Sequence, residues 1–212
     1  MMSRITLTIA LSLVLAVESA YAGNDPVERL AEAVRFRTIS YQEHERIDYG
    51  EFQDFHEFLR GSFPAVFDTL SVERINDHSL LLIWAGEKPE LEPVLFTAHM
   101  DVVPIEPGTL NDWQHPPFAG VVADGRIYGR GTLDDKEGLM ALLEAAEALL
   151  AKGFEPRRTL VFAFGHDEEI GGREGAGAIA RRLQDLGMYF SWMMDEGGMI
   201  VADGPMLSDR PM

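Results

Sequence analysis

The feature that most constrains the fold is a regular alternation of apolar segments. Residues 139–150 place leucine and alanine at the spacing of a buried helical stripe, and residues 175–186 form a second expected helix. Short apolar runs typical of strands precede, separate and follow these helices, at residues 94–98, 159–164 and 190–194. Strand, helix, strand, helix, strand is therefore the expected order. It predicts an α/β fold with a mainly parallel mixed sheet and helices on both faces.

The rest of the chain adds shorter elements, which are recognised by period and by turn residues. Gly61 and Pro64 are expected to end a helix, while Asn76-Asp77 and Asp124-Gly125 have the composition of tight turns. The expected elements are a helix over residues 48–60, strands over 70–72 and 80–84, and a hairpin of 121–123 with 126–128.

The first residues have the pattern of an export signal. Arg4 is followed by an apolar run over residues 5–17, and Ala20-Tyr21-Ala22 supplies the small-x-small pattern of a cleavage site. An uncleaved anchor is the alternative, but the run is shorter than the roughly 18 residues that a spanning helix needs. We therefore expect a signal peptide over residues 1–22, export to the periplasm or the medium, and no stable membrane span.

Charge and cysteine content narrow the possible partners. The chain has no cysteine, so a metal could be held by oxygen and imidazole but not by thiolates. The net charge of -17 argues against nucleic acid, which is bound through basic patches. Most acidic residues are expected on solvated helix faces. A minority form compact clusters next to the apolar runs.

These clusters are expected to meet at one edge of the sheet. His99 and Asp101 follow one expected strand, residues 167–169 (Asp-Glu-Glu) follow another, and Asp195 follows a third. Asp134 stands where the helix after the hairpin begins. In open sheets of this class, sites form beyond the carboxyl ends of the strands. The sequence therefore predicts a site made of carboxylates and one imidazole.

Each cluster alone has a simpler explanation. A lone His-x-Asp is more often a hydrogen bond at a strand end, and Asp134-Asp135 would serve as a helix cap. Three adjacent acids at the end of a buried strand are harder to explain, because they repel one another and lose hydration unless a cation compensates. We therefore predict a metal site in which His99 is a ligand and Asp101 takes the other ring N–H, fixing the tautomer.

The same residues resemble a known family, the di-zinc aminoacylase and carboxypeptidase S family of metallopeptidases. The similarity extends from about Leu30 to the last residue. The GHDEE and DEGG sequences are most similar to the carboxypeptidase S branch of the family, which includes enzymes that act on N-acyl amino acids. It implies the fold of a zinc exopeptidase-like catalytic domain. The blocks that carry it are AHMDVVP (98–104), WQHPPF (113–118), YGRGTLDDK (128–136), GHDEEIGG (165–172) and DEGG (195–198).

The resemblance implies a two-zinc site, with Co²⁺ or Mn²⁺ as substitutes. Asp134 would bridge the two ions. His99 and Asp195 would complete the protein ligands of one zinc, and Glu169 would bind the other. The resemblance also implies a cis peptide bond between Asp134 and Asp135.

The implied reaction is hydrolysis of an amide bond in N-acyl amino acids or short peptides, of the carboxypeptidase or aminoacylase type. Glu168 would be the general base on a metal-bridging water, and Asp101 would orient His99. The expected substrate has a free carboxylate next to the scissile amide. No residue of this chain is assigned to that carboxylate.

The chain departs from the family pattern at its end. Family members carry a further metal-binding histidine and a smaller lid domain, through which any homodimer would form. We expect both to lie beyond Met212. Residues 23–212 are therefore expected to be the N-terminal portion of the catalytic domain, with weak activity or none alone. The alternative is a non-catalytic metal-binding remnant. His115 and His166 are not expected to bind metal, and His44, His56 and His78 are expected at the surface.

Overall fold

The structure, a computed structural model, describes residues 25–197 of the 212-residue chain. The expected signal peptide over residues 1–22 and the last glycine of the DEGG block lie outside this part. None of the helices between residues 25 and 197 has the length and the hydropathy of a segment that crosses a bilayer.

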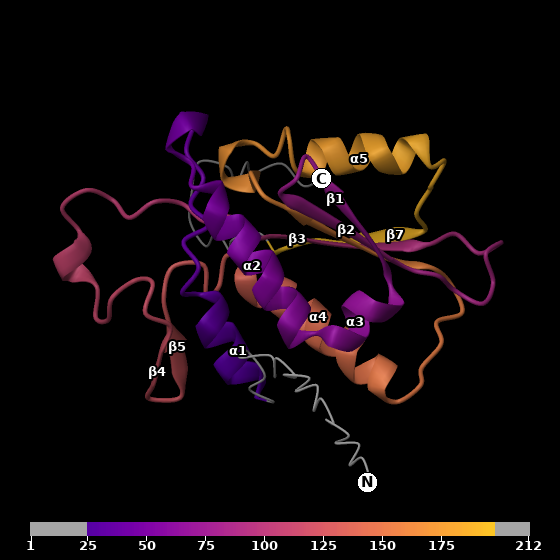
Figure 1. The fold of residues 1–212 in the computed structure, drawn as a ribbon, viewed down its shortest axis with the longest axis horizontal. Coiled ribbons are helices and arrows are strands. Elements are labelled where there is room, and N and C mark those ends of the chain that lie inside the picture. Colours follow the sequence, from indigo (N-terminus) through magenta and orange to yellow (C-terminus); the bar gives the residue numbers. More distant parts are fainter. Residues whose placement is uncertain (1–24, 198–212) are drawn as a thin grey trace, which may run out of the picture.

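A five-stranded sheet forms the centre of the molecule (Figure 1). β2 is antiparallel to both of its neighbours, whereas β6, β3 and β7 are mutually parallel. Four of the five strands therefore run in one direction, which confirms the mainly parallel mixed sheet. In spatial order the strands are β1 (Ser71–Ile75), β2 (Ser79–Trp84), β6 (Leu160–Gly165), β3 (Val94–His99) and β7 (Trp192–Met194).

Helices cover both faces of this sheet, as expected. Figure 1 shows α5 on one face and the other α-helices on the opposite side. The predicted hairpin forms a separate two-stranded sheet of β4 (Val121–Ala123) and β5 (Arg126–Tyr128). The helices are α1 (Pro26–Ala33), α2 (Tyr49–Ser62), α3 (Pro64–Thr69), α4 (Lys136–Ala151) and α5 (Ala176–Asp185), with 3₁₀ turns η1 (His44–Arg46), η2 (Leu110–Asp112) and η3 (Glu168–Ile170).

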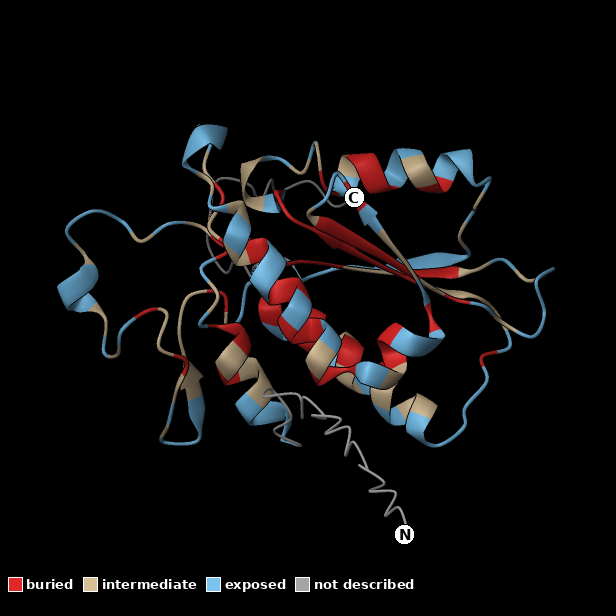
Figure 2. Ribbon diagram, in the orientation of Figure 1, coloured by how far each residue is buried: buried red, intermediate tan, exposed pale blue. Residues whose placement is uncertain are grey.

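Alternation along the strands divides the core into two parts. Leu80 and Leu82 of β2 belong to the larger cluster, which includes Phe52 and Phe55 of α2. Leu81, between them, points to the other face and belongs to the cluster under α5. Figure 2 shows most residues of the inner strands in the colour of buried residues. This burial explains why β2, β3 and β6 read as continuous apolar runs rather than as alternating ones.

The elements around α2 differ in part from the expectation. Pro64 does not simply end the predicted helix, which runs to Ser62; it also begins the short helix α3, where its fixed φ suits the first helical position. His56 of α2 is 2% exposed, so its expected surface position is wrong. Asn76 and Asp77, with φ of 49° and 64°, lie in the three-residue loop between β1 and β2 and confirm the predicted turn, because tight hairpin loops favour positive φ.

Candidate metal centre

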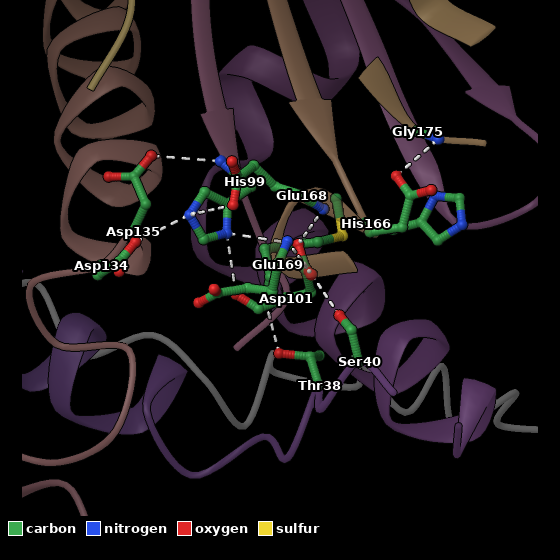
Figure 3. A network of polar contacts seen from close by, with 12 residues as sticks. Thr38, Ser40, His99, Asp101, Asp134, Asp135, His166, Glu168, Glu169 and Gly175 are labelled. Atoms are coloured by element: carbon green, nitrogen blue, oxygen red, sulfur yellow. Dashed lines mark hydrogen bonds and ion pairs between the residues drawn. The ribbon is translucent and has the colours of Figure 1, made fainter. Parts of the chain in front are cut away.

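The predicted acidic clusters meet at the carboxyl edge of the parallel strands. His99 ends β3 and lies opposite Gly165, the last residue of β6. The segment after β6 then carries Glu168 and Glu169, while Asp134 precedes α4. Figure 3 shows these side chains converging around the imidazole of His99. The convergence inferred from strand order is therefore present in the fold.

The imidazole of His99 is buried and contacts acids on both sides. Its Nε2 atom lies 3.0 Å from Asp134 Oδ1. Its Nδ1 atom lies 3.0 Å from the main-chain oxygen of Asp101 and 3.3 Å from Asp101 Oδ1. The backbone N–H of His99 donates to Asp135 Oδ2 at 3.2 Å. This arrangement holds the ring with Nε2 directed at the acidic cluster and Nδ1 directed away from it.

Electrostatics at this edge are strongly perturbed. Burial opposes protonation of His99, but hydrogen bonds to Asp101 and Asp134 and the negative charge of Asp101 and Asp135 outweigh it and raise the pKa of His99 to about 10. Burial, with the negative charge of Asp134, raises the pKa of Glu169 to about 7. Burial likewise raises the pKa of Asp135 to about 6. The crowded carboxylates oppose one another's ionisation, and a bound cation would relieve that repulsion.

Asp101 holds the segment that carries Glu168 and Glu169. The side chain of Asp101 is fully buried, and its two carboxylate oxygens accept the backbone N–H groups of Glu168 and Glu169, each at 3.1 Å. The hydroxyl of Ser40 donates to the same carboxylate. Three donors thus fix one buried charge, and that charge fixes two of the predicted functional residues. Ser40 was not singled out by the sequence, because no local pattern pairs it with Asp101.

Asp167 has a structural role within its acidic triplet. Its carboxylate accepts the backbone N–H groups of Glu174 and Gly175, each at 2.8 Å, and is buried. Two of the three adjacent acids therefore remain available to a ligand. The expectation that a cation must compensate all three overestimated the cost, because backbone donors satisfy Asp167.

Two sets of donor atoms within the described residues have the spacing of metal ligands. In each set the atoms lie within 4.8 Å of one another, and His99 belongs to both. One set adds Asp134 and Glu169, and the other adds Asp135 and Glu196. All donors are oxygen or imidazole nitrogen, which are ligands that divalent zinc accepts. The residues present therefore fit a metal ion.

Asp195 and Glu196 follow β7 at the same edge of the sheet. Asp195 Oδ1 accepts a hydrogen bond from the Thr97 hydroxyl at 2.5 Å, and Asp195 is in neither donor set. Glu196 Oε2 instead lies 3.8 Å from His99 Nε2. Burial raises the pKa of Glu196. Glu196 is thus a donor that the sequence analysis did not assign, although it stands in the quoted DEGG block.

Lys136 anchors the start of α4 beside the site. Its ammonium group is fully buried and donates to the main-chain oxygens of Ala33 at 2.9 Å and Phe36 at 2.6 Å. Burial lowers the pKa of this lysine to about 7. The peptide bond between Asp134 and Asp135 is cis, as the resemblance implied. The acidic pair is therefore attached to a lysine whose position is set by the end of α1 and the segment that follows it.

The remaining histidines lie outside both donor sets. His166 Nδ1 lies 2.6 Å from the Ser79 hydroxyl, and its ring meets that of His78 with centroids 5.4 Å apart. His115 packs on Tyr128, with ring centroids 4.6 Å apart. Neither His115 nor His166 is part of the metal-ligand spacing found in the described residues.

Comparison with known proteins gives consistent relatives. The chain is 45% identical over 174 residues to a probable carboxypeptidase S-like 2 of Dictyostelium discoideum. It is 39% identical over 180 residues to an N-fatty-acyl-amino acid synthase/hydrolase PM20D1 of Xenopus tropicalis. These matches cover 80% and 84% of this chain but 33% and 34% of the relatives, so the chain spans about a third of their length.

A solved structure supports the same fold. Human carnosine dipeptidase 1 superposes with a TM-score of 0.67 at 20% identity, covering 84% of this chain and 39% of that protein. At the sequence level, residues 95–210, more than half of the chain, match a family of peptidases. This segment contains every residue of the candidate site except Ser40. The chain belongs to peptidase family M20/M25/M40.

Proposed function

We propose that this chain carries the catalytic groups of a zinc-dependent hydrolase that cleaves the amide bond of N-acyl amino acids or short peptides. The observation that carries the proposal is the meeting of His99, Asp134, Glu169 and Glu168 at one sheet edge. A buried imidazole with carboxylates on one side fits a metal, and a further carboxylate is left to act on a proton. The family and the names of the relatives agree with peptidase or amidohydrolase chemistry.

Zinc is the proposed metal, held by His99, Asp134, Glu169 and Asp195. The first three have ligand spacing in the structure. Asp195 borders the same cavity as His99 and Glu168, and its neighbour Glu196 offers a second carboxylate there. When bound, zinc polarises the amide carbonyl and makes water more acidic.

Glu168 is the proposed general base. Its Oε2 atom lies 3.9 Å from His99 Nε2, so its carboxylate reaches the proposed metal centre, and its backbone is fixed by Asp101. In the reaction Glu168 accepts a proton from the attacking water, whose oxygen bonds to the carbonyl carbon. The C–N bond then breaks, and the same proton passes from Glu168 to the leaving amine. Water is consumed, and a carboxylic acid and an amine are released.

Asp101 is the proposed positioning residue for His99. Its oxygens at Nδ1 favour the tautomer that carries the proton on Nδ1, which leaves the Nε2 lone pair for a metal. The same carboxylate binds the backbone of Glu168 and Glu169. One buried residue therefore orients a proposed ligand, the proposed base and a second proposed ligand together.

The substrate proposal takes its class from the relatives. One relative is named for N-fatty-acyl amino acids and another for carboxypeptidase S. Both names describe an amide next to a free carboxylate. We therefore propose N-acyl amino acids and C-terminal peptide bonds as substrates, and export of the chain stays a prediction that N-terminal sequencing of secreted protein would test.

The experiment that tests the mechanism is the variant Glu168→Gln. It removes the base and keeps the shape, so zinc content should be unchanged while release of amino acid from N-acyl amino acids falls by about 10²- to 10⁴-fold. The measurement is a fluorescent amine assay on zinc-loaded protein, with metal content determined on the same samples. Turnover retained in Glu168→Gln would refute the assignment of the base.

A further inference from the structure

We propose that Lys136 is a positioning residue of the proposed metal centre and that it acts through Asp134. Lys136 is joined to Asp134 through Asp135, and its side chain is held by main-chain oxygens at and just after the end of α1. The inference rests on the proposed function, because it takes Asp134 as a ligand of the metal. It goes beyond that function by stating what holds this ligand in place before a metal binds.

The contacts that hold the ammonium group of Lys136 are all made by uncharged groups. It donates to the main-chain oxygens of Ala33 at 2.9 Å and Phe36 at 2.6 Å, and it lies 4.9 Å from the centroid of the Phe55 ring. Lys136 and Phe55 are both fully buried. Removing a charged group from water costs free energy, and uncharged partners offset only part of that cost. Packing alone therefore does not account for a lysine here, since a methionine would occupy similar space without the charge.

A second contact already joins α1 to α4. Arg29 binds Glu144 through two hydrogen bonds, from Nε to Oε1 at 2.6 Å and from Nη2 to Oε2 at 2.5 Å. Glu144 lies about two helical turns after Lys136, toward the middle of α4. This ion pair therefore attaches one helix to the other without fixing the start of α4. Lys136 fixes that start, next to Asp134.

The start of α4 is in turn connected to the imidazole of the site. The side chain of Asp135 accepts the backbone N–H of His99 at 3.2 Å, and Asp134 Oδ1 lies 3.0 Å from His99 Nε2 (Figure 3). The main-chain oxygen of Asp135 also accepts the N–H of Leu139 in the first turn of α4, at 3.1 Å. Lys136 thus follows two residues that both contact His99. A displacement of Lys136 would move their carboxylates relative to the imidazole.

The segment that receives Lys136 also supports the other side of the site. This segment, residues 33–40, supplies the carbonyls that bind the lysine and the Ser40 hydroxyl that donates to Asp101. Asp101 in turn accepts the backbone N–H of Glu168 at 3.1 Å. The acid before α4 and the proposed base after β6 are therefore positioned from one common support. Lys136 makes the connection on the side of the acid.

The first test compares Lys136→Met with Arg29→Met. Each change removes a cation that joins α1 to α4, but only Lys136 adjoins the acidic pair. Zinc affinity measured by equilibrium dialysis should fall about 10- to 100-fold in Lys136→Met, the usual effect of removing a group that orients a metal ligand. Arg29→Met should lower the thermal unfolding midpoint and keep zinc affinity within about twofold of the parent. Equal zinc affinities in the two variants would overturn the inference.

The second test reads the geometry of the ligands with Co²⁺ in place of zinc. The visible absorption spectrum of bound Co²⁺ depends on the arrangement of its ligands, and saturating Co²⁺ removes differences in occupancy. Lys136→Met should change the spectrum, whereas Arg29→Met should reproduce that of the parent. Identical spectra in all three proteins would assign Lys136 to the stability of the fold alone and would overturn the inference.

The third test needs no metal, so it separates the inference from the proposed function. Hydrogen exchange at the amides of His99 and Leu139 should be about tenfold faster or more in Lys136→Met and unchanged in Arg29→Met, because the acceptor of both is Asp135. A parent that binds no zinc would refute the proposed metal centre, and this selective exchange would still support the positioning role. Equal exchange in all three proteins would overturn it even if the parent binds zinc. If circular dichroism shows that Lys136→Met does not fold, Lys136→Gln and Arg29→Gln replace the pair, since the amide keeps an N–H donor without the charge.

Discussion

Two acidic loops lie at the carboxyl edge of the sheet, and the fold holds them very differently. Residues 166–175, the β6 loop, are fixed by two buried carboxylates: Asp101 accepts two of their N–H groups and Asp167 accepts two more. Residues 195–197, the β7 loop, are exposed, and Asp195 accepts hydrogen bonds from the Thr97 hydroxyl and from the N–H of Glu196.

The difference indicates how the site is built. The β6 loop carries the proposed base Glu168, whose distance to the reacting atoms must be fixed before substrate binds, and buried acceptors provide that rigidity. The β7 loop carries the proposed ligand Asp195 and its neighbour Glu196, and both residues are exposed. Preorganisation is concentrated on the β6 loop. The predictions below test this contrast.

The largest expected effect is that of Asp101→Ala. It leaves the buried hydroxyl of Ser40 and the part-buried N–H groups of Glu168 and Glu169 without their acceptor. We expect a loss of about 3 kcal/mol or more in the free energy of unfolding, since each unsatisfied buried group costs roughly 1 to 3 kcal/mol. Asp195→Ala, the matched change in the β7 loop, should cost about 0.5 kcal/mol or less. Urea denaturation of both variants is the measurement, and equal losses would contradict the contrast.

Acid should weaken the support behind the β6 loop. His56 is buried, and its Nε2 atom lies 3.0 Å from the main-chain oxygen of His78, whose ring meets that of His166 edge-on. Burial, with the charge of Arg74, lowers the pKa of His56 to about 4 from an ordinary value near 6.5. The unfolded chain therefore binds a proton at a pH where the folded one does not, so this stability is present above pH 6.5 and is lost as pH falls toward 4.

The loss of unfolding free energy that we assign to protonation of His56 is at most about 3 kcal/mol, because each unit of pKa difference corresponds to about 1.4 kcal/mol. The free energy of unfolding measured from pH 7 to pH 4 should decline steeply in the parent and less steeply in His56→Gln. Hydrogen exchange should show the β6 loop opening before the β4–β5 hairpin does. An identical pH slope in parent and variant would refute this role for His56.

A smaller effect is expected from a pair of glycines, one in each loop. A Cβ added at Gly175 would collide with Asp167 Oδ1 and would lie 2.9 Å from the backbone nitrogen of His166. A Cβ at Gly197 would meet nothing within 4 Å among residues 25–197. Gly175→Ala should therefore cost about 1 to 3 kcal/mol, and Gly197→Ala should stay within about 0.5 kcal/mol of the parent. Thermal unfolding distinguishes them, and a reversed order would count against the contrast.

Much of this architecture could be predicted because it depends on local pattern. The strands read as apolar runs, the Asp124-Gly125 turn marked its hairpin, and strand order alone brought His99, Asp134 and Glu169 together. The rest depends on contacts between segments far apart in the chain. Ser40 is 61 residues from Asp101, and Lys136 reaches back to Ala33 over 103 residues. No period or spacing encodes such pairs.

Two local expectations failed for the same kind of reason. His56 has a polar side chain on an amphipathic helix, which favoured the surface, but its Nε2 atom lies 3.0 Å from the main-chain oxygen of His78 and the ring is buried. Asp167 was grouped with two acids that face the site, but backbone donors turn its carboxylate away from them. In both cases a tertiary hydrogen bond decided the position of a polar group that the sequence placed by composition.

The most direct test of the account is zinc binding by His99→Ala. His99 is the one residue common to both donor sets of the described chain, so its loss should weaken zinc binding by about a hundredfold or more. Glu168→Gln, which changes a proposed base and no proposed ligand, serves as the control and should bind zinc like the parent. Equilibrium dialysis with metal analysis gives the affinity, and circular dichroism confirms folding. Tight zinc binding retained by a folded His99→Ala protein would contradict the assignment of this edge as the metal centre.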